Sequence, residues 1–128
     1  MHVNAKGNLG LLKTLTDLYS KGFTCFTPFD DYSPVDCIAM DKEGKTFRIQ
    51  VKYRSPDKHG KYEVAARSVV NGKRTFIDRS LIDYWAVYMS DIDQVIYMPV
   101  SIMDGKGVHS ITRKQLVELD ERLKSAPC

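Results

Sequence analysis

Two short stretches decide the fold: Ser33-Pro34-Val35-Asp36 and, after a polar turn, Phe47-Arg48-Ile49-Gln50-Val51-Lys52. The second stretch alternates apolar and polar residues, a pattern typical of a β-strand. The first leads into an apolar run that ends at residue 40, and the polar residues 41–45 that follow predict a turn. Together they predict a β-hairpin with strands over residues 35–40 and 46–53.

Three polar side chains of this hairpin carry candidate chemistry. Residues two apart on a strand point to the same face, so Gln50 and Lys52 project together, away from Ile49 and Val51. The short turn lets Asp36 face them across the pair. A hard cation such as Mg²⁺ prefers oxygen ligands, which Asp36, Gln50 and the backbone carbonyl of Val51 supply. Lys52 would orient water or neutralise a transition state, so the pattern predicts metal-dependent phosphodiester hydrolysis. The alternative is a solvated hairpin face, since alternating strands normally turn polar residues outward.

The rest of the sequence predicts further strands between two helices. Asn8 can cap a helix that runs to Ser20 and is ended by Gly22. Apolar runs predict strands over 23–29, 62–70, 82–89 and 94–100, and Thr112 can cap a final helix through Leu123. With no linker or repeat in its 128 residues, the chain is expected to form one α/β domain, 1–128, built on a mixed sheet.

The hairpin motif resembles that of the PD-(D/E)XK nuclease superfamily, with Gln50 where an acid is usual. The likeness includes the motif strand Arg48-Ile49-Gln50-Val51-Lys52-Tyr53 and extends to three other stretches: Lys6-Gly7-Asn8-Leu9-Gly10, Lys21-Gly22-Phe23 and Val95-Ile96-Tyr97-Met98-Pro99-Val100. This layout covers most of the chain. It is similar to the family of small PD-(D/E)XK endonucleases that includes a homing endonuclease of bacterial group I introns in transfer-RNA genes.

This resemblance implies a restriction-endonuclease-like core, a mixed β-sheet flanked by helices. It implies sequence-specific cleavage of double-stranded DNA, with intron homing as the role and with Asp36, Gln50 and Lys52 catalytic. The expected cofactor is Mg²⁺ or Mn²⁺, with Ca²⁺ as a non-catalytic substitute. The expected assembly is a homo-oligomer, either a dimer or a tetramer. Two alternatives stay open: a DNA-binding protein on a nuclease fold without cleavage, and a Holliday-junction-resolving nuclease that prefers branched DNA.

Position 11 departs from the family pattern. In the family an acidic residue usually follows the glycine that matches Gly10, whereas this chain has Leu11. If Leu11 replaces a catalytic glutamate, we expect weakened metal binding and slow or absent cleavage. DNA binding should be kept or improved, because the repulsion between a carboxylate and the phosphates is lost. The alternative is an ordinary core leucine of the first helix.

Positive charge gathers in the middle of the chain. Residues 41–79 hold eleven Lys and Arg against five Asp and Glu, although the net charge of the whole chain is only +3. Such a basic segment suits a polyanion such as double-stranded DNA. The Asn-Gly pair at 71–72 predicts a hairpin over residues 62–77, and a two-stranded ribbon fits the major groove of DNA. The expected DNA-binding residues are Asn8, Arg54, Lys58, His59, Lys61, Arg67, Asn71, Lys73, Arg74 and Thr75.

The cysteines and the apolar runs exclude other classes of protein. Cys25, Cys37 and Cys128 lie far apart, and their odd number argues against a disulfide framework, so Cys25 and Cys37 are expected to be buried thiols. No apolar run approaches the length of a membrane span, and nothing at the N-terminus resembles a signal peptide. We therefore expect a cytoplasmic protein without membrane contact.

Overall fold

The computed structural model describes residues 2–30, 32–65, 67–70, 73–76, 79–103, 108–115 and 117–118. Helix α1 (Val3–Ser20) comes first, and two 3₁₀ helices, η1 (Arg79–Leu81) and η2 (Val100–Met103), follow later in the chain. The strands are β1 (Thr24–Phe26), β2 (Cys37–Met40), β3 (Thr46–Arg54), β4 (Lys61–Ala65), β5 (Arg67–Val70), β6 (Lys73–Phe76), β7 (Tyr84–Met89), β8 (Gln94–Pro99) and β9 (Val108–Thr112).

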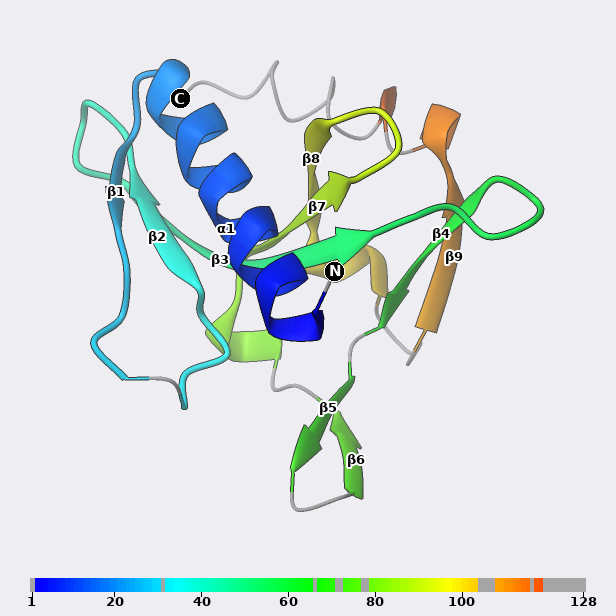
Figure 1. The fold of residues 1–128 in the computed structure, drawn as a ribbon. Helices are drawn as coiled ribbons and strands as arrows, with labels where there is room; N and C mark the ends of the chain where they lie inside the picture. Colours follow the sequence, from blue (N-terminus) through cyan, green and yellow to red (C-terminus); the bar gives the residue numbers. More distant parts are fainter. Residues whose placement is uncertain are drawn as a thin grey trace.

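A five-stranded mixed sheet forms the centre of the molecule, in the order β1-β2-β3-β7-β8 (Figure 1). Neighbouring strands are antiparallel except for β3 and β7, which are parallel. Their connection runs through the smaller elements β4, β5, β6 and η1, because a parallel pair requires a crossover. The predicted α/β fold with a mixed sheet and flanking helices is confirmed.

Helix α1 covers one face of this sheet, crossing in front of β3 in Figure 1. Leu18 of the helix is buried with residues of the sheet, among them Cys37, Ile49 and Ala86. Val51 packs against this cluster as well, so the apolar residues of β3 face the helix as their alternation predicts. Burial of the alternate residues therefore fixes which face of β3 remains for Gln50 and Lys52.

A two-stranded sheet of β4 and β9 packs against the opposite face. Tyr62 and Val64 of β4 are fully buried there with Trp85 and Val87 of β7. The predicted single strand over 62–70 is therefore divided between two sheets. Its first half pairs with β9, a strand that the sequence did not predict, because Tyr62 and Val64 complete the second core.

The second half of that predicted strand forms a separate hairpin. β5 pairs with β6 in antiparallel register, with Val70 opposite Lys73 and Arg67 opposite Phe76. Figure 1 shows this hairpin projecting from the body of the molecule. The two-stranded ribbon thus spans residues 67–76 rather than 62–77, and Asn71 and Gly72 at its turn lie outside the described residues.

The first helix begins earlier than predicted and ends where predicted. Helix α1 begins at Val3 with His2 as its N-cap, so the prediction that Asn8 caps it is wrong. Gly22 does end it, with a φ of 94° that favours glycine. Among the described residues, no helix is both long and apolar enough to cross a membrane.

The last helix begins at the predicted cap. The Thr112 hydroxyl accepts from the Gln115 amide, while the Gln115 side chain accepts from Thr112 N–H. Thr112 therefore caps this helix as its sequence predicts. The predicted end of the helix at Leu123 lies outside the described residues.

Candidate functional site

Asp36 lies where β2 begins, beside the middle of β3. Its backbone N–H donates to the carbonyl of Ile49 at 2.8 Å, which continues the β2–β3 ladder by one residue. Its carboxylate Oδ2 accepts from the N–H of Val51 at 2.6 Å. β2 does not extend as far as Val51. The Asp36 carboxylate therefore accepts the hydrogen bond that a backbone carbonyl of a longer β2 would have accepted from Val51. This bond fixes Asp36 against β3 next to Gln50 and Lys52.

Gln50 and Lys52 lie on the face of β3 that turns away from α1. Their register partners on β7 are Trp85 and Val87, which belong to the core beneath β4 and β9. Gln50 and Lys52 are both half-buried, so this face of β3 is not the solvated face that the alternative interpretation required. The amide oxygen of Gln50 accepts from Trp85 Nε1 at 2.9 Å.

Burial controls the electrostatics of this group. It lowers the pKa of the Lys52 amine to about 8, with the nearby Arg54 charge acting in the same direction and Asp36 opposing both. Burial also raises the pKa of the Asp36 carboxyl, against the Val51 hydrogen bond and the Lys52 charge. Removal from water thus outweighs the attraction between the two charges. No ion pair or hydrogen bond holds the Lys52 amine within the described part of the chain. Groups whose pKa values are shifted in this way gather at functional sites.

The oxygen atoms of this group fit a divalent cation held by one carboxylate. Asp36 Oδ2 is used by Val51, and within the described residues its Oδ1 accepts no hydrogen bond. Gln50 adds a neutral carbonyl oxygen with a second lone pair. The described residues contain no group of three or more acidic, histidine or cysteine side chains that would hold a metal ion. The set suits Mg²⁺, which keeps several waters and needs only one or two carboxylates.

Helix α1 approaches β3 closely at the level of this group. A Cβ atom on Gly10 would lie 3.3 Å from Cγ1 of Val51, so glycine lets the helix come this near. Leu11 is half-buried and packs against the core between helix and sheet. Leu11 therefore has the packing role of a core leucine, and its replacement of a family acid stays a prediction.

The predicted DNA-binding residues lie in three parts of the molecule. Asn8 is on an exposed part of α1, and Lys58, His59 and Lys61 are exposed between β3 and the start of β4. The Asp57 carboxylate organises that loop by accepting from the backbone N–H groups of His59 and Lys61. Strands β5 and β6 carry the remaining four that are described, Arg67, Lys73, Arg74 and Thr75.

Arg54 differs from the other predicted DNA contacts, because its guanidinium already binds protein. Its Nε donates to the carbonyl of Glu63 at 2.6 Å and its Nη1 to the carbonyl of Tyr53 at 2.8 Å. Burial lowers its pKa. Arg54 therefore ties the end of β3 to β4, and a phosphate contact would fall to its remaining N–H groups.

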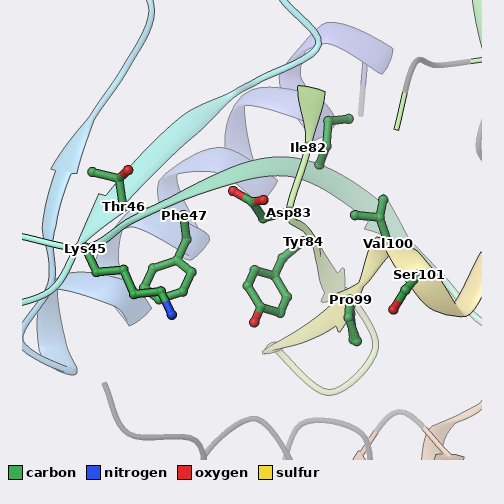
Figure 2. A pocket seen from close by; sticks show the side chains of 9 residues that line it. All are labelled: Lys45, Thr46, Phe47, Ile82, Asp83, Tyr84, Pro99, Val100 and Ser101. Carbon is green, nitrogen blue, oxygen red and sulfur yellow. The ribbon is translucent and has the colours of Figure 1, made fainter. Parts of the chain in front are cut away.

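A pocket of about 340 Å³ lies at the other end of β3 and contains none of the predicted catalytic residues (Figure 2). Asp83, which lines the pocket, accepts from the backbone N–H of Arg48 at 2.8 Å and from two nitrogens of the Arg48 guanidinium. These bonds lower the pKa of the Asp83 carboxyl. Asp83 resembles Asp36 in position, because it comes just before a strand and its carboxylate accepts a hydrogen bond from a backbone N–H of β3. The strand that follows Asp83 is β7, whereas β2 follows Asp36.

Sequence reasoning missed two residues that shape the group around Asp36. The apolar run over 82–89 predicted the strand that contains Trp85, but the hydrogen bond of Trp85 to Gln50 depends on the β3–β7 register. Gly10 was read as part of a motif, whereas its contact with Val51 depends on how α1 crosses the sheet. Neither contact leaves a local sequence signal.

Comparisons with known proteins give one family and one fold. The sequence model of a family described as PD-(D/E)XK endonuclease matches residues 1–125. The fold is similar to the solved structure of a bacterial homing endonuclease, I-Ssp6803I, with a TM-score of 0.81 and 18% sequence identity. That alignment covers 97% of this chain and 92% of the other. No curated protein matches the sequence.

Proposed function

Because the chain belongs to the PD-(D/E)XK endonuclease family, we propose that it is a Mg²⁺-dependent endonuclease that cuts double-stranded DNA at a specific sequence. The observation that carries the proposal is the position of the Asp36 carboxylate, which accepts from the N–H of Val51, the residue between Gln50 and Lys52 on β3, and interacts electrostatically with Lys52. The solved structure with a similar fold is described as a homing endonuclease, which supports intron homing as the biological role.

Each residue of the group has a proposed task. Asp36 Oδ1, the carbonyl of Val51 and Gln50 Oε1 would hold the cation, which lowers the pKa of water and offsets charge on the phosphate when bound. Lys52 would orient the attacking water and neutralise charge that develops on the phosphate. With its pKa near 8, the amine stays mostly protonated at neutral pH and can donate hydrogen bonds.

DNA binding is assigned to two surfaces. We propose that the exposed loop with Lys58, His59 and Lys61 contacts phosphates near the scissile bond, because it follows the strand of Lys52 directly. The projecting β5–β6 hairpin would read bases, since a two-stranded ribbon fits the major groove. One chain covers little DNA, so we propose a homo-oligomer whose symmetry is mirrored in the target.

A second candidate function is DNA binding without cleavage. Within the described residues, Asp36 is the single carboxylate assigned to the cation, because Leu11 and Gln50 stand where relatives are expected to carry acids. A metal site with less negative charge binds cations more weakly. The two candidates share a fold and differ only in activity.

A cleavage assay distinguishes them. The chain and its Leu11→Glu and Lys52→Met variants are incubated with a pool of DNA sequences in Mg²⁺ or Mn²⁺. Proposed cleavage requires products with the parent chain and their loss with Lys52→Met. If Leu11 replaces a family acid, Leu11→Glu should also cleave faster than the parent chain. Products from neither metal, with binding retained, would favour the non-cleaving candidate. Equal rates for the parent chain and Leu11→Glu would show that Leu11 is only a core residue.

A further inference from the structure

Trp85 is the only tryptophan of the chain and is fully buried, yet its polar atom touches the candidate site. Trp85 and Gln50 are direct register partners on the parallel strands β7 and β3. The indole Nε1 donates to Gln50 Oε1 at 2.9 Å. A fully buried ring on a central strand is held by the core around it, so the direction of its N–H is fixed.

This bond distinguishes the two ends of the Gln50 amide. An indole N–H only donates, so it selects the oxygen and rejects the NH₂ group. The terminal torsion of glutamine is broad and close to two-fold, which means that an unrestrained amide would exchange its ends readily. Within the described residues, the Gln50 nitrogen has no hydrogen-bond partner of its own. Trp85 is thus the described residue that orients the amide.

We propose that Trp85 is a positioning residue of the cleavage site, because its indole N–H holds Gln50 with the amide oxygen available to the divalent cation. The oxygen has two lone pairs, one for Trp85 and one for the cation. This inference rests on the proposed function and adds a residue to it. Without the indole N–H, the amide would present its positive NH₂ end to the cation for part of the time.

A carboxylate at position 50 would make this positioning unnecessary, because both of its ends are oxygen. The test is therefore a cycle of four proteins: the parent chain, Trp85→Phe, Gln50→Glu and the double variant. Phenylalanine keeps an aromatic ring in the core and removes the N–H. Mn²⁺ affinity is measured by calorimetry and DNA cleavage by initial rates.

We expect Trp85→Phe to weaken Mn²⁺ binding about tenfold in the parent chain, as for one lost hydrogen bond, and less than about twofold in the Gln50→Glu background. Gln50→Glu alone should strengthen Mn²⁺ binding. Equal losses in both backgrounds would mean that Trp85 acts through core packing, which overturns this inference but not the proposed function. Loss of Mn²⁺ binding in Gln50→Glu would also overturn it. Absence of both binding and cleavage in all four proteins would overturn the proposed function as well.

A second measurement needs no change in the core. Because the chain has one tryptophan, its indole ¹H–¹⁵N NMR signal is unambiguous. We expect Mg²⁺ to shift this signal in the parent chain and to leave it unchanged in Asp36→Ala. An indole signal that does not respond to Mg²⁺ in the parent chain, or that responds equally in Asp36→Ala, would overturn the inference even if Trp85→Phe fails to fold.

Discussion

At the scale of the single residue, Asp36 has a structural and a proposed catalytic task. One carboxylate oxygen accepts a hydrogen bond from Val51 N–H, a group that β2 does not extend far enough to pair. The other oxygen is the one that we propose binds the cation. The structural task requires only an acceptor, whereas the catalytic task requires a charge. Two substitutions at this position therefore separate them.

Asp36→Asn should keep the fold and lose cleavage. The asparagine oxygen still accepts from Val51 N–H, so we expect the free energy of unfolding to change by less than about 1 kcal/mol. Cleavage should fall at least about 100-fold, since loss of an outer partner of a metal ligand alone costs up to that much. Asp36→Ala should be equally inactive and less stable than Asp36→Asn by about 1–3 kcal/mol, because it leaves a partly buried N–H unpaired. Urea unfolding and cleavage rates test both; equal stability of the two variants would contradict the capping role.

Asp83 makes stability depend on pH. Its folded pKa lies below the ordinary 3.8 because of its bonds to Arg48, so its contribution is present above that value and is lost as the pH falls through the lower folded pKa. The difference in unfolding free energy between the parent chain and Asp83→Asn should be largest at neutral pH and shrink below about pH 4. Urea unfolding at several pH values measures it. Glu43→Gln, on an exposed turn, is the control; a similar pH-dependent difference there would contradict the assignment.

At the scale of the element, α1 reaches β3 because of a glycine. Two glycines of the helix differ sharply in their surroundings. An added Cβ on Gly10 would lie 3.3 Å from Val51, whereas one on Gly7 would meet no atom within 4 Å. Both sit in the same helix, so their helix propensities are matched.

Gly7→Ala should stabilise the protein by about 0.5–1 kcal/mol, the usual gain of alanine over glycine within a helix. Gly10→Ala should gain less than this or lose stability, because Val51 must move aside. Since Val51 holds Asp36, Gly10→Ala should also slow cleavage, while Gly7→Ala should not. Urea unfolding with parallel cleavage assays tests the pair, and identical behaviour of the two variants would show that the close approach has no consequence for the site.

At the scale of the whole molecule, we propose that DNA cleavage and base recognition take place on different parts of the protein. The proposed catalytic group lies on the central sheet, whereas the β5–β6 hairpin projects away from the body (Figure 1). A projecting ribbon can enter a groove while the loop after β3 contacts the backbone. The two surfaces should therefore respond differently to mutation.

Arg74→Ala on the hairpin should relax sequence preference and weaken target binding by about 1–3 kcal/mol, as for a lost base contact. Lys58→Ala on the loop should weaken binding to all sequences equally and reduce the salt dependence of log K by about one, as for one lost phosphate contact. Selection from a randomised DNA pool in Ca²⁺, followed by binding titrations at several salt concentrations, measures both. A uniform effect of Arg74→Ala would contradict base reading by the hairpin.

The sequence by itself determined the pieces that depend on neighbours along the chain. The alternation of β3 placed Gln50 and Lys52 on one face, and Gly22 and Thr112 ended α1 and capped the last helix as expected. The close pairing of Asp36 with β3 followed from a short hairpin. These features rest on periodicity and on local hydrogen bonds, both of which depend on residues that are close together in the sequence.

Only the tertiary structure decided what lies against those pieces. The division of residues 62–70 between two sheets, the contact of Gly10 with Val51 and the bond of Trp85 to Gln50 all join segments far apart in the sequence. Each depends on which strands pair and in which register. Burial of Tyr62 and Trp85 in the second core selects that pairing, and no local pattern encodes it because the free energy is gained only when all the strands have assembled.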